Sequence, residues 1–277
     1  MTKITAAEVN KLRKQTGAGM MDCKKALTEA NGDFDKATEI IREKGIAVAN
    51  KRSDREATEG VVFSKTTEDA KKGFIISLNC ETDFVAKNDD FVDLATKILN
   101  LAIEKEPEDL EALKNLNLEN NKTVEENVVE QTGIIGEKLE LSYFDKIVAP
   151  KVVSYIHMDN KLATLVGFNK DDIDEQVCRD IAMQVAAMDP VAIDKDGVPQ
   201  NIVEQELEIG KKQAKAEGKP DNLLDKIAQG KLGKYMKENT LLNQEFIKES
   251  KKTVKQYLQE HDKDLTVTDF KRYSLKQ

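Results

Sequence analysis

The clearest hydrophobic pattern in the chain lies between residues 74 and 102. Apolar and polar side chains first alternate, as along a β-strand with one buried face, and that face carries Phe74, Ile76, Leu78 and Cys80. Beyond Asp90, a residue type suited to a helix N-cap, the apolar spacing changes to three and four residues, as on an amphipathic helix. The apolar face of that helix carries Phe91, Leu94, Ala95, Ile98 and Ala102. The pattern therefore predicts a buried strand followed by a helix.

The stretch NCETDFVAKNDDF, residues 79–91, joins these two elements and places Asp83 beside Phe84. In one interpretation Thr82 caps a short helical turn, Asp83 adds favourable charge near its N-terminus, and Phe84 packs into the core. In the other, Phe84 projects as an anchor for a partner protein, and Asp83 presents a negative charge to the same place. Periodicity and composition leave both interpretations open.

The first 54 residues predict a small bundle of three short helices with a linker. Apolar spacing and breaker residues place these helices at 5–15, 20–30 and 33–45. Thr5 suits the first N-cap, and Gly45 suits the end of the third helix because glycine tolerates the conformation found after helix C-termini. The charged stretch 50–59 resembles a linker, so residues 1–54 are assigned to one N-terminal domain.

The middle of the chain contains a weak internal repeat in which two strands are followed by a helix. The first copy has strands at 60–64 and 73–80 and the helix from Asp90. The second has strands at 152–157 and 162–168 and a helix carrying Val177, Ile181, Val185 and Met188. The repeat predicts a duplicated α+β core, with an N-subdomain at 55–140 and a C-subdomain at 141–200 and 240–277.

Further segments complete the predicted architecture. Residues 108–131 predict a polar helix, after which TGIIGEKLELSYF predicts a turn into another strand. Residues 201–239 predict a projecting antiparallel helical hairpin, because the turn signal GKPD at 218–221 interrupts a thin apolar seam typical of coiled coils. A helix around Val254 and a strand near 267–273 follow. The fold class expected is multidomain α+β.

Composition narrows the classes of function. With 277 residues the chain can form two or three compact units, and its net charge of -8 argues against direct binding of nucleic acid. The first residues, MTKITAAEVNKLRK, lack the apolar core of a signal peptide, and no run approaches the roughly 18 apolar residues of a membrane span. We therefore expect a cytoplasmic protein that does not cross a membrane.

Candidate chemistry is sparse. Cys23, Cys80 and Cys178 are odd in number and far apart, which favours reduced thiols over disulfides or a metal site. The glycines of TGAGMMDCKKAL lack the ending of a phosphate loop and favour a tight turn between helices. A thiol hydrolase built from Cys80, Asp83 and His157 is disfavoured because Cys80 lies on the apolar strand face. We expect no catalytic residue, metal or cofactor.

Two long motifs carry a resemblance to a known family. At TGAGMMDCKKALTEANGDFDKA, and again at NCETDFVAKNDDF, the sequence closely resembles bacterial elongation factor Ts. The likeness continues through VAAMDP, the GKP turn and FIKESKKTV, and so extends over nearly the whole chain. It implies a non-enzymatic guanine-nucleotide exchange factor for elongation factor Tu. It also implies a ubiquitin-associated-like three-helix N-terminal domain, a duplicated α+β core and a helical hairpin.

The resemblance also implies a set of partner contacts. The family motif, here Thr82, Asp83, Phe84 and Val85, pushes into the GTPase domain of the partner near its magnesium and phosphate site. Magnesium and backbone amides together hold the nucleotide phosphates in such GTPases, so disturbing either loosens both. Further contact positions of the family match Lys24, Ile135, Gly136, Gln184, Ile247 and Lys248.

The sequence departs from the family at three places. Gln184 stands where the family often has histidine, and Lys248 stands where an apolar residue is common. Some members continue into a further helical module, and because the chain ends at Gln277 we expect that arm to be absent.

An adaptor that binds peptides through the N-terminal helices remains the alternative function. The sequence also leaves open a monomer, a homodimer or a 2:2 complex.

Overall fold

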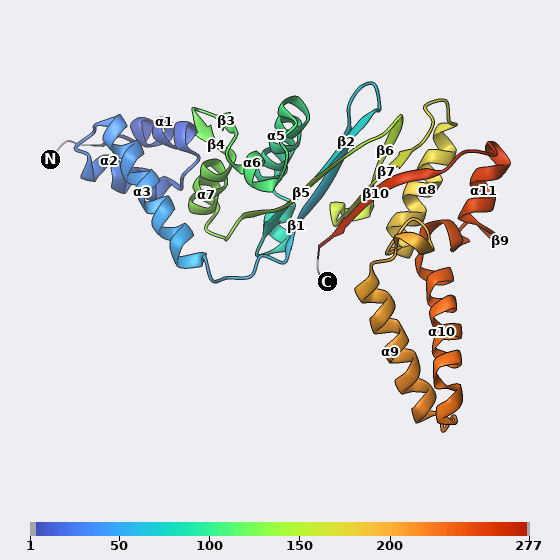
Figure 1. Cartoon of the computed structure of the whole chain (residues 1–277). Coiled ribbons are helices and arrows are strands. Elements are labelled where there is room, and N and C mark those ends of the chain that lie inside the picture. The colour runs from blue at the N-terminus through green and yellow to red at the C-terminus, as the bar shows by residue number, and fades with distance from the viewer. Residues whose placement is uncertain (1–3, 276–277) are drawn as a thin grey trace. The chain divides into compact units, whose positions relative to one another are not determined.

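The computed structural model describes residues 4–275, and it is a mixed helix and sheet protein, which confirms the α+β class (Figure 1). The chain forms two compact units. The first comprises the described residues up to Phe63, with Ile76–Asp145 and Leu275. The second comprises Ser64–Ile75 and Lys146–Ser274. The finer division into domains with boundaries at 54, 140, 200 and 239 stays a prediction.

Three helices open the first unit: α1 (Ala6–Thr16), α2 (Met20–Glu29) and α3 (Phe34–Arg52). The first two follow the prediction within one residue, and Thr5 forms a full capping box with Glu8. Gly17 ends α1 in the left-handed conformation at φ 70°, so the glycine-rich stretch is a turn between helices, as predicted. Their shared core consists of Val9, Leu12, Ala18, Cys23, Ala26, Leu27, Ala30 and Ala37.

The prediction that α3 ends at Gly45 is wrong, because the helix continues to Arg52. Gly45 lies inside the helix and packs against Gly133 of α7 (Val124–Ile135). A Cβ atom added at Gly133 would lie 2.2 Å from the Gly45 Cα. Glycine at position 45 therefore serves a close helix crossing rather than a helix end. The predicted linker at 50–59 is correspondingly helical up to Arg52.

The first sheet has the strand order β1–β2–β5, with β1 at Glu59–Thr66, β2 at Lys72–Cys80 and β5 at Glu140–Val148. Every residue of β2 from Gly73 to Cys80 is buried, which confirms the predicted strand. Two short polar side chains on it are satisfied internally, since Ser77 donates to Asn79 Oδ1 at 2.7 Å and Asn79 Nδ2 donates to the Ala57 carbonyl at 3.0 Å.

Helices α4 (Asp83–Ala86) and α5 (Asp89–Lys105) follow β2. Helix α5 begins before the predicted cap at Asp90, because the side chain of Asn88 accepts the backbone N–H of Asp90 at 2.8 Å and is the true N-cap. Its apolar face is the predicted one and is buried at Phe91, Leu94, Ala95, Ile98, Leu99 and Ala102.

The single polar helix predicted over residues 108–131 is wrong. This segment contains α6 (Leu110–Lys114), a hairpin of β3 (Asn117–Glu119) and β4 (Lys122–Thr123), and then α7. Asn120 and Asn121 both adopt positive φ, at 53° and 56°, and so form the tight turn of the hairpin. Thr123 then starts α7 with a capping box, and Gly136 ends it at φ 82°.

The second unit contains an antiparallel sheet in the order β10–β7–β6. Its strands are β6 (Lys151–Ile156), β7 (Leu162–Phe168) and β10 (Val267–Ser274), all close to the predicted ranges. Helix α8 (Glu175–Met188) packs on this sheet through Val177, Ile181 and Val185. Helix α11 (Val254–His261) adds Val254 and Leu258 to the same core.

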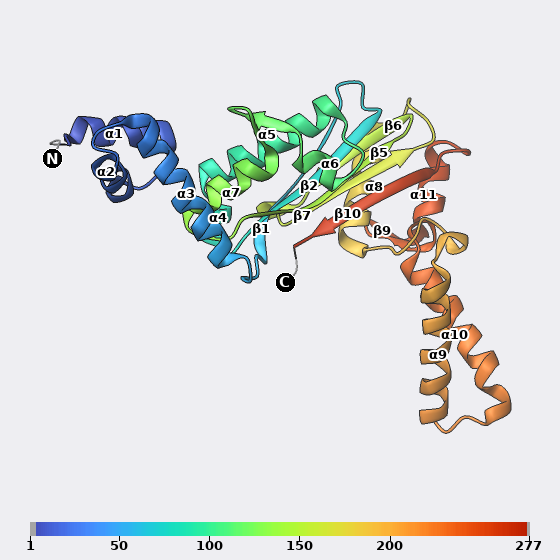
Figure 2. The same ribbon diagram turned by 60° about the vertical axis from the view of Figure 1, so that its left-hand side comes forward.

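The helical hairpin consists of α9 (Gln200–Ala216) and α10 (Leu224–Asn239), which lie side by side (Figure 2). Gly210 faces Ala228, whose Cα atom would lie 3.1 Å from a Cβ atom added at Gly210. Sequence analysis missed the short hairpin of β8 (Glu245–Phe246) and β9 (Glu249–Thr253). Single 3₁₀ turns lie at Met158–Asn160, Lys195–Gly197, Asp221–Leu223 and Leu241–Asn243. Across residues 4–275, no helix has the length and apolar character needed to cross a membrane.

Candidate functional site

Helix α4 presents Phe84 to solvent. The side chain of Thr82 caps this four-residue helix by accepting the Val85 N–H at 3.4 Å, and Ala86 is its one buried residue. Phe84 is 83% exposed. Of the two interpretations of this turn, the cap at Thr82 is confirmed, and the packing of Phe84 into the core is wrong.

Asp83 does not present a free charge beside Phe84. Its Oδ2 atom accepts from Lys87 Nζ at 2.9 Å, and the two residues lie one helical turn apart. The Lys87 side chain is 76% exposed, so a partner that approaches Asp83 can displace the ammonium group at small cost.

The loop after α7 reaches the start of α4 through Glu137. Its Oε2 atom accepts from the Thr82 N–H at 3.0 Å, and its Oε1 atom accepts from the Thr82 hydroxyl at 2.8 Å. Because Glu137 directly follows Ile135 and Gly136, the structure brings these two predicted contact residues close to the Thr82–Val85 turn. Sequence analysis missed Glu137, since nothing in its local pattern distinguishes it from a surface carboxylate.

Glu81 makes a second link between the same segments. Its Oε1 atom accepts from the Lys138 N–H at 2.6 Å, and Arg52 Nη1 donates to its two carboxylate oxygens at 2.8 and 3.0 Å. Partial burial alone would raise the pKa of Glu81, but the Lys138 N–H and the Arg52 guanidinium outweigh it and lower the pKa. Glu81 is therefore held as a carboxylate at neutral pH.

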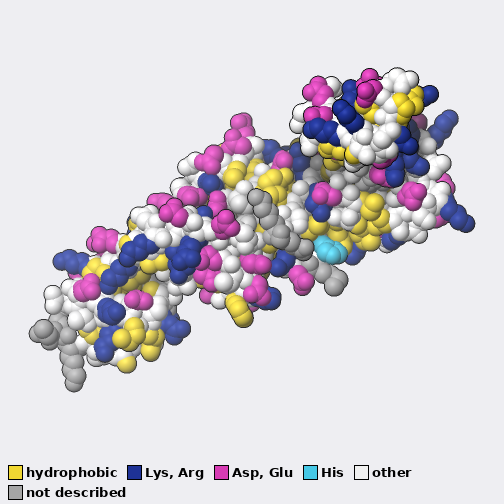
Figure 3. Space-filling view, turned by 90° about the horizontal axis from the view of Figure 1, so that it is seen from below, with side chains coloured by type: hydrophobic (Ala, Val, Ile, Leu, Met, Phe, Trp, Pro, Cys, Tyr) yellow, Lys and Arg dark blue, Asp and Glu magenta, His cyan; other side chains and the backbone are white. Residues whose placement is uncertain are grey.

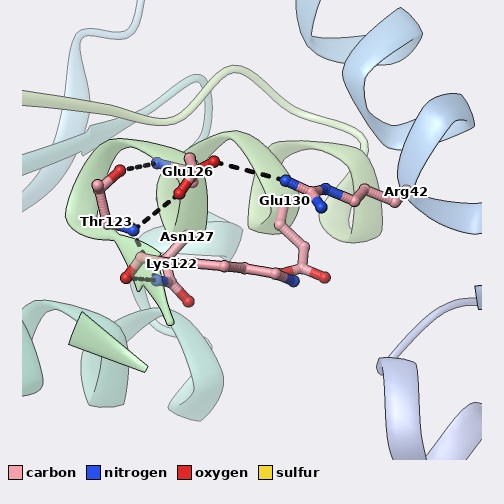
Figure 4. Close-up of polar contacts among 6 residues, drawn as sticks. All are labelled: Arg42, Lys122, Thr123, Glu126, Asn127 and Glu130. Carbon is pink, nitrogen blue, oxygen red and sulfur yellow. Dashed lines mark hydrogen bonds and ion pairs between the residues drawn. The ribbon is translucent and has the colours of Figure 1, made fainter. Parts of the chain in front are cut away.

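Polar contacts also join α3 to α7 near the β3–β4 hairpin (Figure 4). Arg42 on α3 reaches the Glu126 carboxylate at 3.4 Å, and Glu126 itself closes the capping box with Thr123. Lys122 pairs with Glu130 at 2.6 Å. A cavity of about 120 Å³ lies nearby, between α3, α7 and the turn after α1.

Lys24 is the predicted contact residue of the N-terminal helices. It is exposed on α2 and borders a shallow groove with Met21, Lys25, Thr28 and Glu29. Lys24 lies on α2 and Phe84 on α4, so we treat the two positions as separate parts of the candidate surface.

Gln184 lies in the interior, whereas a residue that contacts a partner directly is expected at the surface. Its side chain is fully buried, and its Oε1 atom accepts the Ile247 N–H at 2.9 Å. Its Nε2 atom donates to Gln244 Oε1 and to the Glu245 carbonyl, each at 3.1 Å. In the described conformation Gln184 is a structural link with no exposed atom, and its role as a contact of the partner stays a prediction. Ile247, which it holds, is 41% exposed.

Lys248 neutralises a buried carboxylate. Its Nζ atom lies 2.7 Å from Asp180 Oδ1, and Asp180 is 4% exposed. Asp180 also accepts from the Tyr257 hydroxyl at 3.1 Å and from Gln176 Nε2 at 2.6 Å. Burial, with the charge of Asp180 beside it, raises the pKa of Tyr257. The charge of Lys248 thus has an internal role, which an apolar residue at this position would not fill.

The remaining candidates have structural partners. The Cys80 thiol donates to the Thr82 carbonyl at 3.1 Å, and burial raises its pKa to about 12, so the thiolate is suppressed at neutral pH. His157 Nδ1 lies 3.0 Å from the Tyr155 hydroxyl. Within residues 4–275, no three His, Cys, Asp or Glu side chains gather closely enough to hold a metal ion.

Comparison of the sequence with known proteins identifies its family. The family model described as Elongation factor TS matches residues 81–277, which is more than half of the chain. Elongation factor Ts of Porphyromonas gingivalis is 53% identical over 274 residues, covering 98% of both chains. Elongation factor Ts of Christiangramia forsetii is 51% identical over 279 residues, covering 99% of this chain and 100% of its own. This chain belongs to the elongation factor Ts family.

Proposed function

We propose that the protein is the guanine-nucleotide exchange factor for elongation factor Tu in translation elongation. It binds the GDP-bound GTPase, disturbs the magnesium and phosphate site, promotes release of GDP and leaves when GTP binds. The single observation that supports this most directly is Phe84, an aromatic side chain 83% exposed within the family motif. An exposed aromatic residue on a capped turn is suited to fill a pocket of a partner protein.

The proposed action needs no covalent chemistry and no cofactor. A GTPase holds GDP through magnesium and through backbone amides that cradle the phosphates, so a small displacement of either weakens both. Phe84 displaces the partner backbone near this site, and Asp83 brings a carboxylate toward the same place. Because binding is linked, GDP must weaken the binding of the factor by the ratio in which the factor weakens the binding of GDP.

Each unit carries proposed contact residues of its own. In the first unit these are Thr82–Val85 with Ile135 and Gly136, and Lys24 forms a separate contact on α2. In the second unit Ile247 makes the contact, while Gln184 and Lys248 hold the β8–β9 hairpin from which it projects. In this proposal Gln184 positions Ile247 instead of touching the partner.

Release of fluorescent GDP from the cognate elongation factor Tu tests the proposal. We expect the purified protein to accelerate release in proportion to its concentration until the GTPase is saturated. Unchanged release, together with failure to recover elongation factor Tu from a bacterial lysate, would favour the peptide adaptor instead. Light scattering of the complex would show whether it assembles as one copy of each protein or as a 2:2 complex.

A further inference from the structure

The helical turn that carries Phe84 is too short to be stable in one orientation by itself. Helix α4 has four residues and buries only Ala86. A single helical turn fixes several backbone dihedrals in return for one hydrogen bond, so it is unstable in water without other contacts. The direction of Phe84 must therefore be set by what holds the ends of the turn.

Two carboxylates hold the start of the turn in a reciprocal arrangement. Glu81 accepts the N–H of Lys138 at 2.6 Å, and Glu137 accepts the N–H of Thr82 at 3.0 Å. Each of the two chain segments thus gives a carboxylate to the backbone of the other. We call the set of Glu81, Thr82, Glu137 and Lys138 the carboxylate clasp. Hydrogen bonds to an ionised acceptor are about twice as strong as neutral ones, so the clasp stabilises the contact between the two segments.

The end of α3 is attached to the clasp as well. Arg52, the last residue of α3, donates to both oxygens of Glu81, and Lys138 Nζ donates to the Ser53 carbonyl at 3.1 Å. The side chain of Glu81 is 16% exposed and that of Arg52 is 35% exposed, so water screens this pair less than a surface ion pair.

We propose that Glu81 and Glu137 are positioning residues, which hold Phe84 and the Ile135–Gly136 loop as one preformed contact surface. Arg52 connects the position of α3 to that surface through Glu81. The inference rests on the proposed function, because it assigns the clasp a purpose in nucleotide release. A preformed surface avoids the entropic cost of ordering the turn on binding, and a loosened clasp lowers the fraction of molecules in which Phe84 is correctly aligned.

The test compares Glu81→Gln and Glu137→Gln with Glu140→Gln. Glu140 is the matched control because its carboxylate pairs with the Lys138 ammonium, at 3.2 Å, whereas the acceptors of the Lys138 and Thr82 backbone amides are Glu81 and Glu137. The first measurement is amide hydrogen exchange of the free protein. We expect Lys138 in Glu81→Gln, and Thr82 in Glu137→Gln, to exchange about tenfold faster or more, since each loses a charged acceptor. Glu140→Gln should leave both amides unchanged.

The second measurement is the rate of GDP release as a function of factor concentration. We expect Glu81→Gln to lower the rate at saturation by about tenfold, which corresponds to about 1.4 kcal/mol, with a smaller change in the half-saturating concentration. A purely structural role would lower the amount of folded protein and leave the rate per folded molecule unchanged.

Arg52 provides a second variant in case Glu81→Gln does not fold. Arg52→Gln should speed hydrogen exchange at the Lys138 amide and slow GDP release, each by less than Glu81→Gln does. Arg52→Lys should lose less than Arg52→Gln in both measurements. Added to Glu81→Gln, Arg52→Gln should cause no further loss, because both act on one interaction. Additive losses would overturn the connection from α3 through Glu81.

The outcomes that overturn the positioning role are distinct from those that refute the proposed function. An unchanged Lys138 amide in a folded Glu81→Gln or Arg52→Gln variant would show that the clasp does not hold the turn. Loosened amides with a wild-type rate of GDP release would show that release does not need the clasp. If the wild-type protein did not accelerate release of GDP from elongation factor Tu, the proposed function would be wrong, and the amide measurement would still decide whether the clasp exists.

Discussion

Phe84 lies at the surface because of where α4 begins. Residues four apart on a helix share a face, so Thr82, which is anchored by Glu137, lies above Ala86, which is buried. Phe84 lies two positions from each and points to the opposite side. A four-residue turn is too short to show hydrophobic periodicity, and sequence patterns alone therefore left the direction of Phe84 open.

Truncation of Phe84 separates a surface anchor from a core residue. We expect Phe84→Ala to change the free energy of unfolding by less than about 0.5 kcal/mol, since the side chain is mostly in water. GDP release should slow by roughly thirtyfold, because a buried aromatic anchor at an interface is worth about 2 kcal/mol or more. Fluorescent-GDP release and thermal melting measure the two effects.

Phe91→Ala is the matched control for this experiment. Phe91 is 1% exposed, so the same truncation there should destabilise the protein by about 3 to 5 kcal/mol through lost burial and a cavity. If Phe84→Ala melted at as low a temperature as Phe91→Ala and still promoted GDP release from elongation factor Tu at the wild-type rate, Phe84 would have no role as an anchor.

At the scale of elements, the sequence predicted most strands and helices but not their junctions. Strands β2 and β7 and helices α5 and α8 were predictable because each carries a long apolar face with a single period. The β3–β4 and β8–β9 hairpins were missed because their strands have two to five residues, too few to show a period.

The contacts of the candidate site were less predictable than its residues. Glu81, Glu137 and Asp180 act through partners that lie far away in the sequence, at Lys138, Thr82 and Lys248. No local pattern distinguishes such carboxylates from those of a solvated surface. The family resemblance supplied candidate positions, but only the fold shows that Gln184 is buried.

The crossing of α3 and α7 depends on two glycines. We expect Gly133→Ala to destabilise the first unit by about 3 kcal/mol or more, because the added Cβ would lie 2.2 Å from backbone of Gly45 that cannot rotate away. Gly233→Ala is the control, since its Cβ would meet nothing within 4 Å and alanine favours the helix by about 1 kcal/mol. Equal urea midpoints for these two variants would contradict the close crossing.

The β8–β9 hairpin should depend on Gln184 for stability and on Ile247 for contact. Gln184→Leu keeps a similar volume but leaves the Ile247 N–H and the Glu245 carbonyl without their partner, so we expect a loss of about 2 to 4 kcal/mol. Ile247→Ala, at a half-exposed side chain, should cost much less stability and instead weaken binding of elongation factor Tu. Thermal melting measures the stability of each variant, and a titration measures its binding to elongation factor Tu. A stable Gln184→Leu variant with an unstable Ile247→Ala variant would contradict these roles.

At the scale of the whole molecule, basic and acidic residues are nearly balanced in number. On the face shown in Figure 3, basic and acidic side chains are intermixed along the surface. The net charge of -8 thus comes from a small excess of carboxylates, 51 against 43 basic residues. What distinguishes individual carboxylates is their partners, and those partners determine how the protein responds to acid.

Several carboxyl groups have a pKa below the ordinary value. The Lys170 ammonium, with the Asp264 N–H, lowers the pKa of Asp262, and the Lys138 N–H with Arg52 lowers that of Glu81 against partial burial. A group whose pKa is lower in the folded state binds fewer protons than in the unfolded chain. Its stabilisation is fully present above the ordinary value of about 4 and is lost as pH falls through the folded pKa.

Removal of one partner should therefore flatten the dependence of stability on pH. In Lys170→Met the pKa of Asp262 should return toward its ordinary value, so the urea midpoint should fall less steeply than in the wild type as pH drops below about 4. Lys263→Met is the control, because it removes the same charge from an exposed position beside Asp262, and Lys263 is not among the groups that lower the pKa of Asp262. Its urea midpoint should fall with pH as steeply as that of the wild type. Parallel profiles for all three proteins would mean that the Lys170 ion pair, at 2.6 Å, does not contribute to acid sensitivity.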